Sequence, residues 1–84
     1  MERGAKRYQV TLPLRIGEGT GITRDLSTSG VFYETEKLHT LGETVGLAAD
    51  FEGCTLQIEG SVVRVERANG HFGVAVALTS FRFN

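Results

Sequence analysis

Apolar and polar residues alternate along much of this chain, and this alternation constrains the fold more than any other feature of the sequence. Every second residue from Tyr8 to Ile16 is apolar, and the same pattern returns over 44–51 and 72–78. Successive side chains of a β-strand point to opposite faces, so a period of two indicates strands with one buried face. The sequence therefore predicts a sheet protein.

Six such strands are expected, separated mostly by tight turns rich in glycine. The turns lie at 17–21, 27–30, 52–53 and 68–70, where Gly, Asn and Ser favour reversals of the chain. Without any convincing amphipathic helix, this order predicts an all-β fold, an antiparallel barrel or sandwich. We favour a six-stranded antiparallel β-barrel with a C-terminal helix absent or minimal, because closure removes exposed edges. The predicted strands cover 8–16, 22–26, 31–35, 44–51, 55–67 and 72–78.

Three finer expectations follow from the pattern. The longest connection, 36–43, contains Leu38 and Leu41, which we expect to pin it to the barrel. A bulge or bend is expected near Gly60, because the inward residues change there from Leu56 and Ile58 to Val63 and Val65. Near the C-terminus, Phe81 and Phe83 are expected either to cap the barrel or to form an interface.

Size and composition limit the classes of function. The 84 residues suffice for one domain, and 40% hydrophobic with 23% charged residues is the mix of a globular protein. The single cysteine, Cys54, allows no internal disulfide and favours a reducing cytoplasm. No apolar run approaches a membrane span or a secretory signal. A net charge of −1 argues against DNA or RNA as a partner.

The N-terminal residues 1–7 form a separate, basic segment before the predicted barrel of residues 8–84. Arg3 and Arg7 are four residues apart, with Lys6 between them, in a stretch without periodicity that we expect to be a flexible arm. A guanidinium presents a planar fork of donors that fits phosphate oxygens or the edge of guanine. Taken alone, this pattern is also that of an ordinary solvated tail.

A second polar segment, Asp25 to Gly30, follows the second predicted strand. Asp25 and Ser27 are two residues apart, so they share a face if the strand continues. A carboxylate accepts hydrogen bonds from the N–H groups of guanine, and Gly30 lets the backbone turn and leaves space for a ring. The alternative is a local turn in which the side chains only satisfy nearby backbone groups.

Together the two segments resemble the signature of the PilZ domain, a bacterial family of receptors for cyclic di-GMP. The R-x-x-x-R part is Arg3 to Arg7, and the D-x-S-x-x-G part is Asp25 to Gly30. Later stretches, 41–42, 60–64 and 72–76, are similar to the family's later strands. The resemblance covers nearly the whole chain.

The resemblance implies a signalling receptor that binds cyclic di-GMP at the rim of the barrel. Arg3 and Arg7 would contact phosphate and guanine, and binding would order the arm and change a surface seen by a protein partner. Asp25, Ser27 and Gly30 would shape the floor of the site, and Lys6 and Ser29 are further candidates. Many family members continue into a C-terminal helix, whereas this chain ends soon after its last predicted strand.

Other functions are less well supported by the sequence. A PilZ-like adaptor that contacts proteins without binding nucleotide is the main alternative, although all five motif residues are present. A barrel for single-stranded nucleic acid would need stacking aromatics and a basic groove, and the chain has no Trp. His39 and His71 are isolated from other ligating residues, so we expect no metal, no cofactor and no catalysis. Self-association remains an open alternative.

Overall fold

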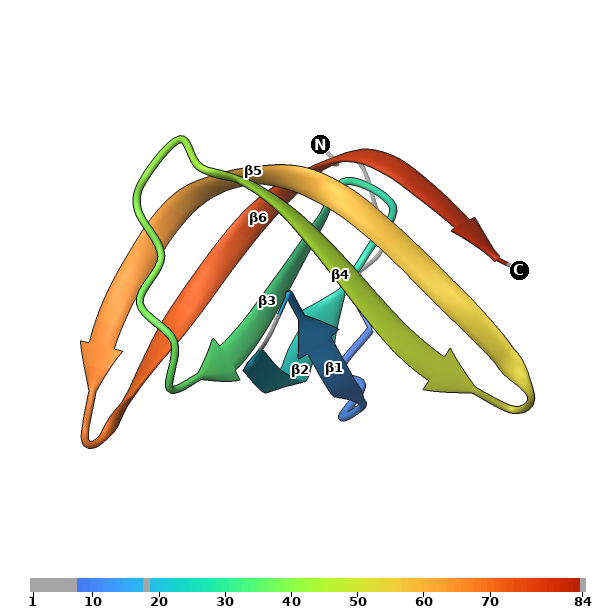
Figure 1. Cartoon of the computed structure of the whole chain (residues 1–84), viewed down its shortest axis with the longest axis horizontal. Helices are drawn as coiled ribbons and strands as arrows, with labels where there is room; N and C mark the ends of the chain where they lie inside the picture. The colour runs from blue at the N-terminus through green and yellow to red at the C-terminus, as the bar shows by residue number, and fades with distance from the viewer. Residues whose placement is uncertain (1–7, 18, 84) are drawn as a thin grey trace.

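The structure is a computed structural model that describes residues 8–17 and 19–83. Six antiparallel strands form a closed barrel in the order β1-β2-β3-β6-β5-β4, which confirms the predicted architecture (Figure 1). No helix occurs in this part of the chain. The strands are β1 (Pro13–Ile16), β2 (Gly19–Leu26), β3 (Gly30–Thr35), β4 (Thr44–Phe51), β5 (Cys54–Ala68) and β6 (His71–Phe83).

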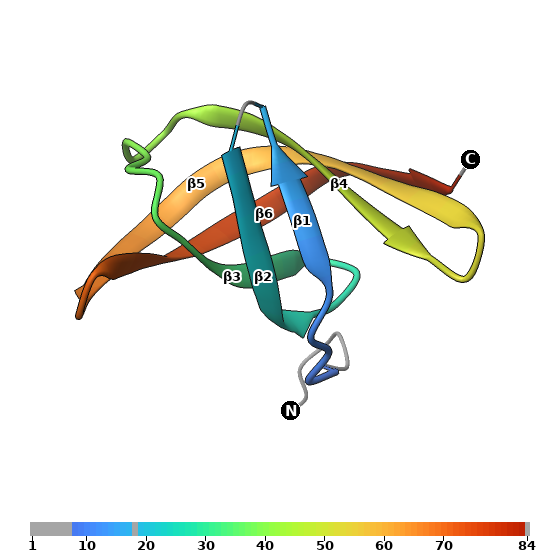
Figure 2. The same ribbon diagram turned by 60° about the horizontal axis from the view of Figure 1, so that its bottom comes forward.

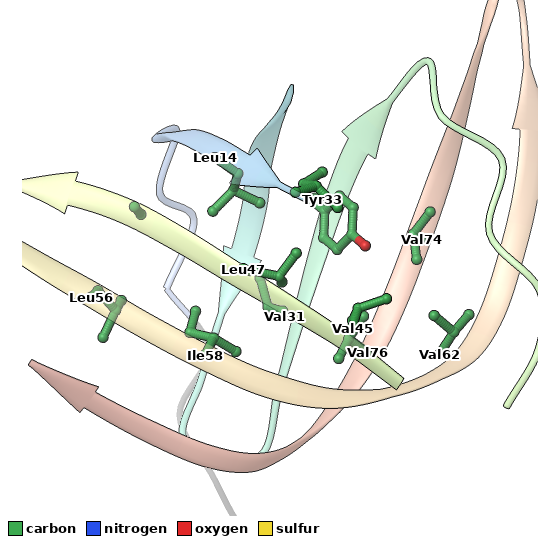
Figure 3. Packing of buried hydrophobic residues seen from close by; sticks show 12 residues of the cluster. Leu14, Val31, Tyr33, Val45, Leu47, Leu56, Ile58, Val62, Val74 and Val76 are labelled. Carbon is green, nitrogen blue, oxygen red and sulfur yellow. The ribbon is translucent and has the colours of Figure 1, made fainter. Parts of the chain in front are cut away.

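The buried apolar core is formed by inward residues of β1, β3, β4, β5 and β6, and the partly buried Leu26 of β2 packs against it. Tyr33 of β3 lies at its centre with no exposed surface, surrounded by branched aliphatic side chains (Figure 3). Burying each such side chain stabilises the fold by about 1.5–3 kcal/mol before the entropy of folding is counted. The predicted inward face of β6 is confirmed, since Val74 and Val76 are buried while Phe72 and Leu78 pack against the cluster. The other buried apolar residues are Leu14, Ile16, Val31, Val45, Leu47, Ala49, Leu56, Ile58 and Val62.

The first strand is shorter than the sequence pattern predicts, because the segment before it is held by a side chain. The hydroxyl of Thr23, which is buried, accepts a hydrogen bond from Leu12 N at 2.8 Å and donates one to Val10 O. Residues 8–12 therefore run beside β2 without the regular ladder that defines a strand. Tyr8, predicted to face inward, is 58% exposed.

The second strand begins earlier than predicted, at Gly19, inside the stretch expected to be a turn. A Cβ on Gly21 would lie 2.8 Å from Glu34 O and 2.9 Å from Cδ1 of Ile16. Glycine is needed here for close approach between strands, and the reversal itself uses Gly17 at a φ of 57°.

The connection after β3 is held by a different residue from the two predicted. Leu38 and Leu41 are 63% and 64% exposed, so the expectation that they pin this connection is wrong. His39 is buried instead, with its ring edge-on to Tyr33 at a centroid distance of 6.1 Å. Glu43 accepts a hydrogen bond from Thr40 N at 2.8 Å, which fixes the turn before β4.

The long strand β5 contains two irregularities in its pairing with β6. One lies between Glu59 and Gly60, where a bulge is predicted, but its extra residue is Thr79 on the β6 side. The inward face of β5 shifts further along, at Val63, which is 58% exposed and not inward as predicted. This second bulge positions the candidate site.

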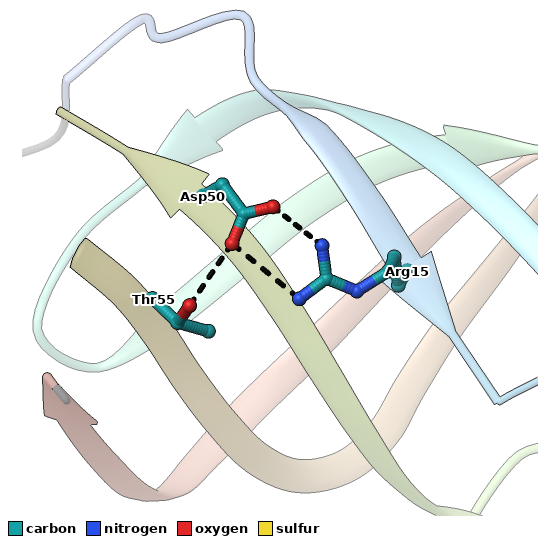
Figure 4. Close-up of polar contacts among 3 residues, drawn as sticks. All are labelled: Arg15, Asp50 and Thr55. Carbon is teal, nitrogen blue, oxygen red and sulfur yellow. Dashed lines mark hydrogen bonds and ion pairs between the residues drawn. The ribbon is translucent and has the colours of Figure 1, made fainter. Parts of the chain in front are cut away.

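The barrel closes through a short seam of two residue pairs between β1 and β4, Arg15 with Ala48 and Ile16 with Leu47. An exposed ion pair supports this seam, because Arg15 Nη1 lies 2.6 Å from Asp50 Oδ2 (Figure 4). Asp50 also accepts a hydrogen bond from Thr55 Oγ1 at 3.0 Å. These contacts hold the pKa of the Asp50 carboxyl below its usual value, chiefly through the hydrogen bond from Arg15.

Candidate functional site

A bulge in β2 turns Asp25 to the outside of the barrel. Thr23 pairs with Tyr33 and is buried, whereas Asp25 pairs with Phe32, so Arg24 is the extra residue. Without the bulge, Asp25 would share the inward face of Thr23, two residues earlier. The insertion places its carboxylate on the outer face beside Phe32.

The turn after β2 is built by the hydroxyl of Ser27. Ser27 Oγ accepts hydrogen bonds from Ser29 N at 3.2 Å and Gly30 N at 3.1 Å. These are the hydrogen bonds to nearby backbone groups that the alternative interpretation, a local turn, predicts. Gly30 is not among the residues with positive φ, so the turn does not require the left-handed conformation of glycine at this position. Its lack of a side chain matters for packing, because a Cβ would lie 3.1 Å from Val76 O.

A matching bulge in β5 turns Arg64 to the same outer face. Val62 pairs with Val76 and Arg64 pairs with Ala75, so Val63 is the extra residue. Because Phe32 also pairs with Ala75, one outward row crosses four strands in the order Asp25, Phe32, Ala75 and Arg64. The two bulges thus place a carboxylate and a guanidinium at opposite ends of the row.

Between these charged ends lie the ring of Phe32 and the small side chain of Ala75. Gly30 pairs with Ala77 in the next outward row, beside Ala75. The result is a groove of about 320 Å³. The lining combines apolar side chains with charged and hydroxyl groups, and polar groups of this kind orient small ligands in binding sites. The groove is lined by Asp25, Leu26, Ser27, Ser29, Gly30, Val31, Phe32, Val63, Arg64, Ala75, Val76 and Ala77.

Phe32 and Arg64 belong to the groove but were not predicted as site residues. The guanidinium of Arg64 lies 5.7 Å from the centroid of the Phe32 ring, and its Nε lies 2.9 Å from Glu66 Oε2. The Phe32 ring covers Gly73, where a Cβ would lie 2.6 Å from its Cζ. Strand periodicity alone does not find these residues, because a bulge decides which face Arg64 occupies.

Three of the predicted site residues, Arg3, Lys6 and Arg7, lie outside the described residues. The point where the described chain begins is nevertheless fixed. Tyr8 and Leu26 form an isolated antiparallel bridge in which each N–H donates to the other's carbonyl at 2.9 Å. The backbone of Tyr8 is therefore held beside Leu26, a residue that lines the groove together with its neighbours Asp25 and Ser27.

A larger, shallower groove of about 720 Å³ lies beside the start of β2. Its lining includes the charged side chains Glu34, Glu36 and Lys37 together with the imidazole of His71. Arg24 Nη2 lies 3.1 Å from Glu34 Oε1 and lowers the pKa of that carboxyl. This mixture of charges offers no concentrated site for an anion.

Two features are absent from residues 8–17 and 19–83. No group of three or more His, Cys, Asp or Glu side chains is placed to hold a metal ion there. No helix among them is long and apolar enough to cross a membrane.

The fold is a small closed antiparallel β-barrel with a groove on its outer face. The PilZ domain family matches residues 2–83, and the chain belongs to this family. The solved structure of the Bacillus subtilis inhibitor of motility (MotI/DgrA) superposes with a TM-score of 0.80 at 16% sequence identity. That match covers 98% of this chain and 44% of the other, so this chain spans less than half of the solved protein. No curated protein matches the sequence.

Proposed function

We propose that this chain is a receptor for cyclic di-GMP, and that the ligand lies in the groove between Asp25 and Arg64. The observation that carries the proposal is the outward row that joins these two side chains across Phe32 and Ala75. A guanine ring is planar and carries N–H donors along its Watson–Crick edge. The carboxylate of Asp25 is a suitable acceptor for those donors, and the guanidinium of Arg64 is suited to stack on a base.

The phosphates require cations, which we assign to the N-terminal arm. The bridge of Tyr8 to Leu26 fixes the point from which residues 1–7 depart, directly beside Ser27. Arg7 precedes Tyr8, and the chain back to Arg3 spans at most about 18 Å when extended. Both guanidiniums are therefore within reach of a ligand in the groove. Ordering of this arm over the ligand would change the surface presented to a protein partner.

Ser27 and Gly30 serve this site indirectly. The Ser27 hydroxyl holds the turn that forms one rim of the groove. Gly30 has no side chain, which allows β3 to approach β6 closely at the floor of the groove. Replacement of Ser27 with Ala should weaken binding by loosening the rim. Lys6 and Ser29 remain candidates for further contacts with the phosphates.

Isothermal titration with cyclic di-GMP tests the proposal. Loss of one contact worth about 1–3 kcal/mol weakens binding roughly ten- to a hundredfold, so Arg7→Ala and Asp25→Asn should each show that loss. Arg67→Ala is the matched control, since Arg67 packs on Phe72 at the end of β5, outside the groove. Cyclic di-AMP, which lacks the guanine N–H donors, should bind at least about tenfold more weakly.

The alternative function, an adaptor that contacts proteins without nucleotide, predicts a different result. A folded wild-type chain would then give no heat of binding with cyclic di-GMP. Binding that is unaffected by both Arg7→Ala and Asp25→Asn would instead mean that the ligand binds at another part of the surface.

A further inference from the structure

Strand β6 extends beyond the strand that covers its outer edge. β3 pairs with β6 only from Phe72 to Ala77, whereas β5 pairs with it as far as Phe83. The last contact on the outer edge is the hydrogen bond from Leu78 N to Ser29 O at 3.0 Å. Within residues 8–17 and 19–83, no backbone partner covers the outer edge of Thr79–Phe83, which projects along β5 away from β3 (Figure 2).

An open edge of this kind is a template for another strand. Alternate residues of a strand direct both their N–H and C=O groups to one side, so this segment offers donors and acceptors outward. Natural proteins usually protect such edges with charged residues, proline or a covering segment. Here the sequence at the edge is Thr-Ser-Phe-Arg-Phe, with a single charge.

The face of this segment is also apolar. Phe81 and Phe83 are 41% and 56% exposed, and their rings meet edge-to-face with centroids 5.9 Å apart. Phe81 pairs with Ile58 and Phe83 with Leu56, so both rings continue the apolar face of the core beyond the closed part of the barrel. The open edge and the exposed rings lie on the same few residues.

We propose that a second copy of this chain pairs antiparallel along Thr79–Phe83. The five residues are centred on Phe81, so two-fold pairing of the whole segment sets Phe81 opposite Phe81 of the second copy. Thr79 then faces Phe83, and Ser80 faces Arg82. Directly opposed Cβ atoms in such pairs lie about 4.5–5.5 Å apart, close enough for four phenylalanine rings to form one cluster.

The opposite face of the same pairing is complementary in charge. On β5 and β6, Gln57 pairs with Arg82 and Glu59 pairs with Ser80. In the proposed dimer, Arg82 faces the small Ser80 of the second copy, and Glu59 of the second copy lies one strand further. Two strand spacings of about 4.8 Å are spanned by an arginine and a glutamate side chain reaching toward each other. Symmetry forms this ion pair twice.

Neighbouring registers are disfavoured by the same residues. Pairing centred on Arg82 sets two guanidiniums directly opposite each other, which is destabilising. Pairing centred on Ser80 extends to Ala77, whose outer edge is already paired with Gly30 of β3. The register centred on Phe81 uses all of the open edge and nothing beyond it.

Sedimentation velocity over a concentration series tests the proposal. We expect the wild-type mass to rise from 9.1 kDa toward twice that value as concentration increases. Arg82→Glu should raise the dissociation constant about tenfold, because two ion pairs become repulsive contacts. The combined variant Arg82→Glu with Glu59→Arg should restore it. Phe83→Lys should abolish the dimer, and the charge-matched control Arg67→Glu should leave it unchanged.

Three outcomes would overturn the proposal. A wild-type chain that stays monomeric, with the amides of 79–83 exchanging freely with solvent, shows that no strand pairs with this edge. A monomer whose amides in 79–83 are protected indicates that another segment of the same chain covers the edge. A dimer that persists in Phe83→Lys, or that is not rescued by the double charge reversal, uses a different surface.

Discussion

Gly60 provides the sharpest test of how β5 and β6 pack at their first bulge. A Cβ at this position would lie 2.2 Å from Ala77 O and 2.6 Å from Cγ1 of Val76. The nearest atom is backbone, so Gly60→Ala cannot be relieved by a change of rotamer. Overpacking in a core typically costs about 1–3 kcal/mol, and a contact with fixed backbone belongs at or above the upper end.

For a domain of this size, about 3 kcal/mol corresponds to a fall in Tm of roughly 12–24 °C. Gly46→Ala is the matched control, because a Cβ on this exposed strand glycine meets nothing within 4 Å. It should leave stability unchanged or raise it by about 0.5–1 kcal/mol. Thermal unfolding followed by circular dichroism measures both variants. Equal Tm values for the two would refute the close approach of β5 and β6 at Gly60.

Three further predictions concern the ion pair at the seam, the buried tyrosine and the buried threonine. Arg15→Ala should raise the pKa of Asp50 toward its usual value, measured by NMR titration of the carboxyl; an unchanged midpoint would contradict the ion pair. The stability from this pair is present above the usual carboxyl pKa of about 4 and is lost as pH falls through the lowered value. Burial raises the pKa of the Tyr33 hydroxyl, so the folded state favours the protonated tyrosine. The stability that the buried, protonated Tyr33 contributes is lost as pH rises above about 10, where the tyrosine of the unfolded chain ionises. Tyr33→Phe should therefore reduce alkaline unfolding of the barrel. A variant as sensitive to alkali as the wild type would count against this. Thr23→Val should cost about 1–3 kcal/mol in urea unfolding, because Leu12 N–H loses its acceptor, and faster amide exchange at Leu12 should accompany the loss.

Much of the barrel follows from local pattern, because a half-buried strand must alternate. Strands β3, β4 and β5 lie close to their predicted positions for this reason, whereas β6 continues to Phe83, beyond its predicted end at residue 78. The pattern fails where a side chain or a missing side chain decides the structure. Thr23 holds residues 8–12 in place of a ladder, and Gly21 extends β2 into a glycine-rich stretch that is typical of a turn.

The candidate site was predictable in part. Asp25, Ser27 and Gly30, which their spacing in the sequence brought together as candidates, all line one groove, and their role in binding stays a prediction. Arg64 was missed because the bulge at Val63 decides which face it occupies. Alternation does place Phe32 outward, but only the pairing of the strands shows that it lies between Asp25 and Arg64. A bulge adds one residue to one strand only, and it becomes visible when the partner strand and its register are known.

Chemical-shift mapping by NMR with added cyclic di-GMP locates the bound ligand on the surface of the barrel. We predict saturable changes concentrated on the amides of the groove floor and rim, at Ser27, Gly30, Ala75 and Ala77, together with the side chain of Arg64. Changes confined to the larger groove around Gly19 and Lys37, or a spectrum that does not change at all, would contradict the assignment of the site.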